Sequence, residues 1–324
     1  MRWCSFTTGT QDLGAARLGC VHPGTGRVLD AGAWARSRDA ETPQDLVDLV
    51  EASIATQERV TDLVRSAPED GTGWVRVDEV RFLAPLRAPN SLRDFLGYRD
   101  HVERAAARRG TLVPEAWDRM PVYYKGNRRS IIGPGDSAPW PSYTDKLDFE
   151  CEVAAVVGRG GRDLSAGQAL DHVFGYTVMN DWSARDVQKD EMACWLGPAK
   201  AKDFATTLGP WVVTPDEWDP GDEHEMTVTV DGELWAGGTT AGRRWTFAEM
   251  LAWVSRDEDL WPTDVLGSGT FGVAAGSTST GGWCPGPRWC WRSRGWESSA
   301  TLWRRSQDDP TWKTLPGGDP ASNG

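Results

Sequence analysis

The sequence is poor in several features that mark common classes of protein. No uninterrupted apolar run has the length of a membrane span, and the first ten residues, MRWCSFTTGT, lack the apolar core of a signal peptide. Positive charge is also scarce: 35 Lys and Arg stand against 47 Asp and Glu, a formal net charge of −12. Sequence-independent binding to nucleic acid needs Lys and Arg that replace counterions, so this balance argues against it. We therefore expect a cytoplasmic protein that binds neither membrane nor nucleic acid.

Cysteine shows no pattern. The six cysteines, at positions 4, 20, 151, 194, 284 and 290, have no C-x-x-C spacing, and the chain is too long to depend on disulfide cross-links. We expect free thiols, with Cys151 a buried packing residue. The 324 residues, 39% of them hydrophobic, are enough for one large domain and a smaller one.

The first part of the chain, residues 1–85, alternates short β-like runs with turn signals. Residues 16–32 predict a hairpin, because a Pro-Gly turn separates two apolar runs. Residues 42–67 carry apolar side chains at helical spacing and predict one helix with Thr42 as its N-cap. Residues 75–86 predict a strand.

Two acidic residues stand on an otherwise apolar strand in LDFECEVAAVVG, residues 147–158. Side chains alternate along a strand, so Glu150 and Glu152 point the same way, while Cys151 and Val153 point the other. Neighbouring like charges repel, and burying each of them is costly unless a cation is present. The pair is a candidate divalent-metal site. The alternative is the solvated face of an antiparallel strand.

A second polar cluster lies in MNDWSARDVQ, residues 179–188. As a helix, this segment places Asp181, Arg185 and Gln188 at i, i+4 and i+7 on one face. A carboxylate, a guanidinium and an amide then point at one spot, and Asp181 becomes a candidate third metal ligand. The alternative is the solvent-exposed face of an ordinary helix.

These two segments, followed by LGPAKAKDFATTLGPW at residues 196–211, resemble the fumarylacetoacetate hydrolase family. The resemblance covers about residues 75–275. It implies an α+β fold, with a catalytic core of layered mixed β-sheet and β-roll over residues 86–276. It also implies a small N-terminal α+β domain over residues 1–85, without catalytic residues, and a homodimer.

Residues 91–110 predict a helix that opens at Ser91 and ends at Gly110. On this helix Asp94 and His101 share one face. By the resemblance, the spacing D-F-x-x-x-R-x-H that joins them matches a metal carboxylate and the general base of the family. On periodicity alone, His101 is a surface residue of a charged helix.

Three further residues take their roles from the same resemblance. Tyr124 in P-V-x-Y matches a substrate contact, Lys202 in G-P-x-x-x-K-x-F matches a catalytic donor, and Thr270 in GSGT matches a position beside the substrate. The glycines there allow close backbone approach. The alternative for Lys202 is a structural ion pair with Asp203 or Asp181.

The four expected metal ligands form an all-oxygen set: Asp94, Glu150, Glu152 and Asp181. Such a set favours Mg²⁺, Mn²⁺ or Ca²⁺ over Zn²⁺. The resemblance implies that the metal chelates two oxygens of a 1,3-dicarbonyl or 2-oxo acid and acts as a Lewis acid. It implies His101 as the general base toward water, and Arg185, Gln188 and Lys202 as donors to the substrate and to developing negative charge.

Together with this set of residues, the resemblance implies a metal-dependent hydrolase that cleaves a C–C bond in a 1,3-diketo acid or acylpyruvate-like substrate. Lys125 and Asn127 differ from true fumarylacetoacetases, which leaves the identity of the substrate open. One alternative is a 2-oxo acid decarboxylase, hydratase or isomerase on the same scaffold. Another is a catalytically dead, truncated relative. His101 with Asp94 favours hydrolysis, because lyase members often lack that pair.

The chain changes character in residues 277–324. This tail holds six of the 19 tryptophans, shows neither strand nor helix period, and contains no match to the acid that, by the resemblance, orients the catalytic histidine. The genetic code offers a reason, because Trp289-Cys290-Trp291 read one base earlier must give Val-Leu. A frameshift is therefore our hypothesis for the tail, and a genuine divergent ending is the alternative.

Overall fold

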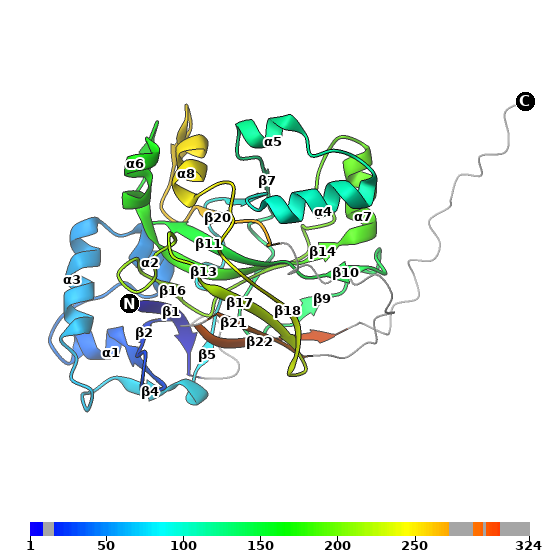
Figure 1. Ribbon diagram of the computed structural model, residues 1–324. Coiled ribbons are helices and arrows are strands. Elements are labelled where there is room, and N and C mark those ends of the chain that lie inside the picture. Colours follow the sequence, from blue (N-terminus) through cyan, green and yellow to red (C-terminus); the bar gives the residue numbers. More distant parts are fainter. Residues whose placement is uncertain (9–15, 272–287, 294–295, 305–324) are drawn as a thin grey trace, which may run out of the picture.

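The computed structural model describes residues 1–8, 16–271, 288–293 and 296–304. Its centre is a 13-stranded mixed sheet (Figure 1). Ten strands follow one path across it: β4 (Trp74–Arg76), β3 (Arg27–Asp30), β2 (Arg17–Val21), β1 (Arg2–Thr7), β16 (Val212–Val213), β13 (Val173–Asp181), β11 (Cys151–Val157), β20 (Val265–Gly267), β6 (Leu92–Phe95) and β7 (Tyr123–Lys125). Off this path, β15 (Thr206–Leu208) pairs with β13 and with β8 (Ile131–Ile132), and β5 (Arg81–Phe82) pairs with β1.

A five-stranded sheet lies below strands β11, β13 and β20 of the central sheet in Figure 1. Its order is β18 (Glu233–Thr239), β17 (Glu225–Val230), β21 (Arg288–Ser293), β22 (Trp296–Arg304) and β9 (Ala138–Pro139). Two short pairs complete the strands: β10 (Leu147–Asp148) with β14 (Ser183–Ala184), and β12 (Gly161–Arg162) with β19 (Asp259–Leu260).

The helices lie in separate groups around the central sheet (Figure 1). Near the N-terminus lie α1 (Ala31–Arg36), α2 (Leu46–Glu51) and α3 (Ile54–Arg65). Another group contains α4 (Arg99–Arg109), α5 (Glu115–Arg119) and α7 (Arg185–Ala193), while α6 (Ala166–Ala169) and α8 (Phe247–Ser255) pack beside each other. Among the described residues, no helix is long and apolar enough to cross a membrane.

The central sheet is buried on both faces, which is why every residue of β11 is buried. On one face Val153, Ala155 and Val157 join a core that contains Val228 of β17. On the other face Ala154 and Val156 belong to a second core with side chains from the N-terminal helices, among them Trp34, Leu46 and Leu49. The expected α+β class, with layered sheets, is confirmed.

The hairpin expected within residues 16–32 is confirmed, since β2 and β3 pair in antiparallel fashion. The single helix expected over residues 42–67 is wrong. Extended backbone at Ala52 separates α2 from α3, and the N-caps are Asp45 and Ser53, whose side chains accept from backbone N–H groups. Such caps satisfy N–H groups that have no partner inside a helix.

The continuous strand expected over residues 75–86 is also wrong, because the 3₁₀ turn η1 (Val77–Glu79) divides it into β4 and β5. Strand β1 pairs directly with β16 of the remaining chain. The N-terminal strands therefore extend the central sheet, and the division at residue 85 stays a prediction.

Two further helix predictions failed at the residues that matter most for the site. The one over residues 91–110 is wrong for its first third: Leu92–Phe95 form strand β6, parallel to β20, and only α4 is helical, ending at Gly110 in the left-handed conformation. The one over residues 179–188 is wrong up to Ala184, because Asp181 ends strand β13 and α7 begins at Arg185. Sheet pairing with neighbouring strands decided both cases, and periodicity does not report it.

The four described cysteines outside the tail are free thiols, as expected, and Cys151 is buried. In the tail, the absence of a strand pattern was misleading, since β21 pairs with β17 and β22 pairs with β9. Backbone pairing at an open sheet edge needs no side-chain period. The rest of residues 277–324 lies outside the described residues, and the frameshift hypothesis stays a prediction.

That hypothesis predicts a result at the level of DNA. Resequencing the gene is expected to reveal a single-base error near the codon for Gly276, and the corrected chain is expected to be more soluble and more active. Under this hypothesis, the segment encoded in the correct frame would form a closing strand whose side chains cover apolar surface. The side chains encoded in the shifted frame would leave that surface exposed. If the DNA encodes no strand-like segment in another frame, the ending is genuine and the hypothesis is wrong.

Candidate metal centre and active-site cavity

Four buried carboxylates meet at one end of the central sheet. Asp94 comes from β6, Glu152 from β11, Asp181 from the last position of β13, and Glu150 from the residue before β11. Each offers one oxygen such that the four oxygens all lie within 4.8 Å of one another. The sequence predicted these four residues as metal ligands, and the structure brings all four together.

The order of the strands explains the convergence. Strands β6, β20, β11 and β13 are neighbours in the sheet, and Gly267 of β20 lies between Asp94 and Ala154 in register. Glu152 lies two residues before Ala154 and so points to the same face. A side chain between the two acids would fill the centre of the cluster, and glycine leaves that space open.

One half of the cluster is already neutralised by protein cations. The ammonium of Lys202 lies 2.7 Å from Glu150 Oε2 and also contacts Asp181 Oδ2. Arg185 lies 2.7 Å from Glu150 Oε1. Burial alone raises the pKa of Glu150, but the charges of Arg185 and Lys202 outweigh burial and hold that pKa below its usual range. Burial lowers the pKa of Lys202, and Asp181 and Glu150 more than offset this.

The other half of the cluster, Asp94 and Glu152, has no ion pair with a described cation. Within the described residues, Asp94 Oδ1 and Glu152 Oε1 are buried without a hydrogen-bond partner. Burial, followed by the charge of Asp181, raises the pKa of Asp94, and burial with the charge of Asp94 raises the pKa of Glu152. Unpartnered buried carboxylate oxygens are costly, and a divalent cation with oxygen ligands would satisfy them. These donors therefore fit Mg²⁺, Mn²⁺ or Ca²⁺.

Three of the four carboxylates, Asp94, Glu150 and Glu152, line a cavity of about 220 Å³. Five of the other predicted site residues line it: His101, Tyr124, Gln188, Lys202 and Thr270. Arg185 stands behind the wall, where its guanidinium donates to Asp148 at 2.6 Å and to the Gln188 side-chain oxygen at 2.9 Å. In this arrangement Arg185 positions the side chains of Glu150 and Gln188.

Tyr124 and Thr270 occupy different environments. The Tyr124 hydroxyl donates to Asp181 Oδ1 at 2.8 Å, so it is bound to an expected metal ligand. The Thr270 hydroxyl is buried without a partner among the described residues and lines the cavity. A substrate oxygen placed in the cavity would find a donor there. The roles predicted for both residues stay predictions.

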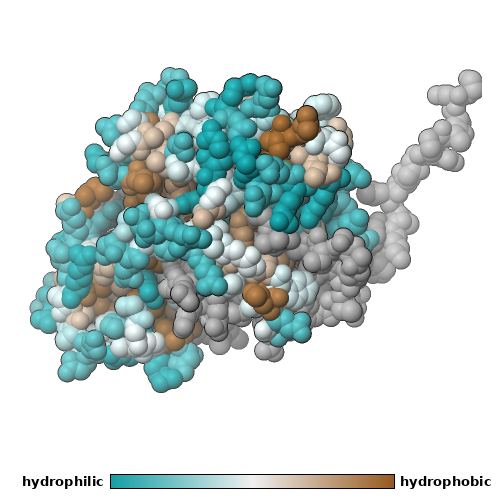
Figure 2. All heavy atoms as spheres, viewed as in Figure 1, coloured by the Kyte–Doolittle hydropathy of each residue, from teal (hydrophilic) through white to brown (hydrophobic). Residues whose placement is uncertain are grey.

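His101 projects into the cavity from α4, whose outer surface is hydrophilic (Figure 2). Burial lowers the pKa of His101, and the charge of Glu150 offsets only part of that shift. The imidazole is therefore neutral near pH 7 and able to accept a proton. It has no hydrogen bond to any described residue. By the resemblance, an acid that orients it belongs in the tail, where the sequence contains no match.

Sequence reasoning missed residues that support the cluster. Asp148, which stands two residues before Glu150, is buried and holds Arg185. The backbone N–H of Gly269 donates to Glu152 Oε2 at 2.9 Å. The acid at 148 belongs to the same D-F-E-C-E run as the E-x-E pair, so a signal was present. The backbone donor of Gly269 leaves no signal beyond the glycine itself.

Replacement of Gly267 by Ala is expected to weaken metal binding by about tenfold or more, in line with other changes that displace metal ligands. A Cβ at this position would lie 2.2 Å from Met179 Cε, 2.5 Å from Asp94 Oδ1 and 3.0 Å from Glu152 Oε2. The Met179 methyl and the Asp94 carboxylate must therefore move, and Glu152 is crowded. Calorimetric titration with Mg²⁺ and Mn²⁺ measures the effect. Gly167→Ala is the matched control, because a Cβ there meets nothing within 4 Å. Equal affinities for the two variants would contradict the prediction.

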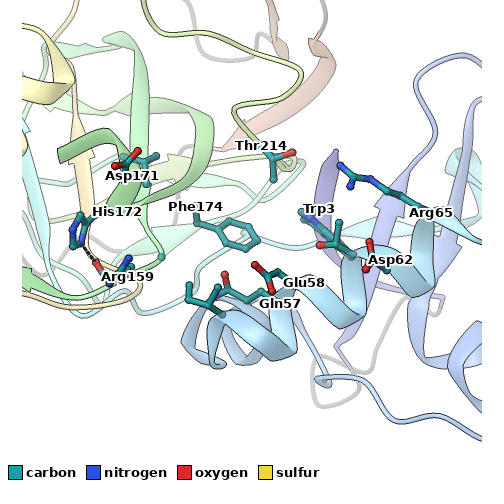
Figure 3. Close-up of a pocket in the computed structure, with 14 residues that line it drawn as sticks. Trp3, Gln57, Glu58, Asp62, Arg65, Arg159, Asp171, His172, Phe174 and Thr214 are labelled. Atoms are coloured by element: carbon teal, nitrogen blue, oxygen red, sulfur yellow. Dashed lines mark hydrogen bonds between the residues drawn. The ribbon is translucent and has the colours of Figure 1, made fainter. Parts of the chain in front are cut away.

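A larger groove of about 410 Å³ lies away from the carboxylates (Figure 3). Glu58 and Asp62 of α3 form one wall, and Arg159, Asp171 and His172 form the other. The His172 imidazole is hydrogen-bonded to the Arg159 carbonyl oxygen at 3.0 Å. No residue predicted as a site residue lines this groove, so the catalytic prediction concerns only the smaller cavity.

The sequence profile for the fumarylacetoacetate (FAA) hydrolase C-terminal domain matches residues 91–295. The bovine protein named oxaloacetate tautomerase FAHD2B, mitochondrial, is 30% identical over 261 residues, which cover 80% of this chain and 77% of that protein. Residues 91–295, which the profile matches, include every residue of the candidate site.

Solved structures agree in fold. Fumarylacetoacetate hydrolase from psychrophilic Exiguobacterium antarcticum superposes with a TM-score of 0.71 at 25% identity, covering 94% of this chain and all of that chain (100%). Maleylpyruvate hydrolase from Sphingobium sp. SYK-6, solved with manganese(II) and pyruvate, superposes with a TM-score of 0.69 at 18% identity, covering 95% of this chain and 100% of that one. Given the profile match and the bovine relative, this chain belongs to the fumarylacetoacetate hydrolase family.

Proposed function

We propose that this protein is a divalent-metal-dependent hydrolase that cleaves the C–C bond between the two carbonyl groups of a 1,3-diketo acid. The observation that carries the proposal is the set of four buried carboxylates, two of them with unpartnered oxygens. Three of the four, Asp94, Glu150 and Glu152, line a cavity that His101 also lines. Mg²⁺ is the expected ion, with Mn²⁺ and Ca²⁺ as alternatives, because all four ligands are oxygens.

A bound divalent cation would supply Lewis-acid polarisation of two substrate oxygens. The protein side chains perform the remaining tasks. His101 takes a proton from water, and the water oxygen attacks the distal carbonyl carbon. The bond between that carbon and the methylene then breaks, and its electron pair is protonated on the methylene carbon. The products are a carboxylic acid and a 2-oxo acid, so the elements of water are divided between them.

Neutral and cationic donors stabilise charge during these steps. Gln188 and Thr270 reach the cavity and present an amide and a hydroxyl to the substrate oxygens. Lys202 faces the same space and stays charged, because Asp181 and Glu150 raise its pKa. A preorganised donor of this kind lowers a barrier by about 3 to 4 kcal/mol. These are the groups that we assign to the developing negative charge.

A second candidate function is tautomerisation or isomerisation of a 2-oxo acid. It is favoured by the 30% identity to the bovine protein named oxaloacetate tautomerase. In that reaction His101 would move a proton between carbon and oxygen, and no C–C bond would break. Decarboxylation on the same scaffold and a catalytically dead relative are the remaining alternatives.

One panel separates these functions. The protein is incubated with acylpyruvates, fumarylacetoacetate and oxaloacetate in the presence of Mg²⁺ or Mn²⁺, and products are identified by NMR. Products that contain the elements of water across a broken C–C bond support the hydrolase. Keto–enol exchange without cleavage supports the tautomerase, and carbon dioxide release supports the decarboxylase. Metal binding without any turnover supports the dead relative. Sedimentation of the same sample tests the homodimer, which is part of the proposal.

A further inference from the structure

The cavity has two chemically different ends, and the register of β6 and β7 creates them. Asp94 is paired with Tyr124 across these antiparallel strands, and both side chains belong to the polar floor. One step further, the Leu96 N–H donates to the Val122 carbonyl oxygen at 3.2 Å. Because side chains repeat every two residues along a strand, Leu96 and Val122 point to the same side as Asp94 and Tyr124.

Along helix α7, the side chains that line the cavity also change from polar to apolar. Gln188 and Met192 are four residues apart, so they share one face of the helix and lie one turn from each other. Both line the cavity, as do Leu96 and Val122. Exposure rises along the same direction: Asp94 is 5% exposed, while Leu96 is 40% and Met192 is 42% exposed. The apolar row Leu96, Val122 and Met192 therefore lies at the mouth, and the acids lie at the floor.

Among the described residues at the mouth, none is a cation that could pair with a second carboxylate of a substrate. Among the described lining residues, the basic groups are Lys202 and His101. Lys202 is buried at the floor, where it is paired with Glu150 and Asp181. A second carboxylate at the mouth would lose water without gaining an ion pair, which is unfavourable. An alkyl or aryl group there would instead cover apolar side chains.

We infer that the substrate is a monocarboxylate whose acyl group is uncharged and apolar, and that Leu96, Val122 and Met192 select it. This inference rests on the proposed function and names its substrate class. The 1,3-diketo acid head group lies at the acidic floor, and the acyl chain extends along the apolar row to the mouth. Each methylene added within reach of that row is expected to raise kcat/KM about fourfold, the equivalent of its burial.

The first test uses a matched pair of substrates. In 2,4-dioxo acids with a butanoyl or a succinyl group, the terminal methyl of one is replaced by a carboxylate in the other. With Mg²⁺ present, kcat/KM for the butanoyl compound is expected to exceed that for the succinyl compound at least about a hundredfold, the scale of burying an unpaired polar group. Equal values, or a preference for the succinyl compound, would overturn the inference.

A positive charge introduced at the mouth supplies the second test. Met192→Lys places an ammonium beside the acyl site, on a helix that tolerates Lys well. It is expected to raise kcat/KM for the succinyl compound about tenfold or more and to lower that for the butanoyl compound. Leu112→Lys is the control, since Leu112 is 90% exposed and does not line the cavity. An unchanged ratio in Met192→Lys would mean that this wall does not contact the acyl group.

A binding experiment keeps the inference separate from the proposed function. The acids 2-oxohexanoate and 2-oxohexanedioate lack the second carbonyl, so they cannot be cleaved in the proposed way. Calorimetry with the Mg²⁺-loaded protein is expected to show at least tenfold tighter binding of 2-oxohexanoate. If no diketo acid is hydrolysed but this ratio holds, only the proposed function fails. If the dioate binds as tightly, or neither acid binds, the inference itself is wrong.

Discussion

Replacement of Glu152 by Gln is expected to abolish metal binding, with a loss of at least about a hundredfold in affinity, while the metal-free protein keeps its stability. Glu152 is fully buried, and burial and the charge of Asp94 raise its pKa. Gln has nearly the same shape and no charge, so it removes the negative charge that burial and Asp94 disfavour in the metal-free protein. Metal binding needs the ionised form, which Gln cannot provide.

Glu150→Gln is expected to behave differently, although the two acids are only two residues apart. Glu150 accepts from both Lys202 and Arg185 at 2.7 Å, so removing its charge leaves two buried cations with fewer partners. We expect the same loss of metal binding together with a loss of about 2 kcal/mol in the free energy of unfolding.

Calorimetry and urea denaturation of the metal-free variants measure the two effects separately. Glu103→Gln is the matched control, because Glu103 lies on the exposed face of α4. Two outcomes would contradict the assignment. One is unchanged metal affinity in either variant. The other is a metal-free Glu152→Gln protein as destabilised as Glu150→Gln, because Glu152 would then need a cation partner that the described structure does not contain.

His101→Ala is expected to lower kcat about a hundredfold or more, with metal affinity unchanged. The imidazole lines the cavity but is not one of the four clustered carboxylates, so its removal affects the proton transfer and leaves the ligands in place. Steady-state kinetics and metal titration measure both quantities. His22→Ala, on the N-terminal hairpin, serves as the control.

The pH profile adds a second readout for the same residue. A general base must be neutral, and burial lowers the pKa of His101 below its usual value of about 6.5. Activity is therefore expected to persist as the pH falls through 6.5 and to decline only at lower pH. In His101→Ala this acidic limb should disappear. If the variant still decarboxylates oxaloacetate at the original rate, decarboxylation gains support, because that reaction needs no base for water.

The sequence predicted the members of the candidate site better than the elements that carry them. Glu150 and Glu152 were correctly expected to lie close together, because their relation depends only on the alternation of neighbouring side chains. Asp94 and Asp181 were expected on helices, yet they lie on β6 and at the end of β13. Both errors have one cause: pairing with strands distant in sequence decides whether such a segment is extended, and local periodicity contains no record of that pairing.

The sequence also did not identify the ion-pair partners of the site residues. The sequence left open whether Lys202 is catalytic or paired with Asp203 or Asp181, and the structure shows ion pairs with Asp181 and Glu150. Residue 150 precedes residue 202 by more than fifty positions, so no spacing rule connects them. The split of the cluster into a neutralised half and a half with unpartnered oxygens follows from that contact.

The sequence by itself determined the residue types, the family motifs and the hard, all-oxygen character of the candidate metal site, because these depend on side-chain chemistry and short spacing. Only the tertiary structure decided which carboxylates lack a cation and where the cavity turns apolar. The register of β6 against β7 places Leu96 beside Val122, and helix α7 brings Met192 to the same mouth. Such neighbours are set by sheet pairing and helix packing between segments that are distant in sequence. Local sequence patterns do not report these contacts.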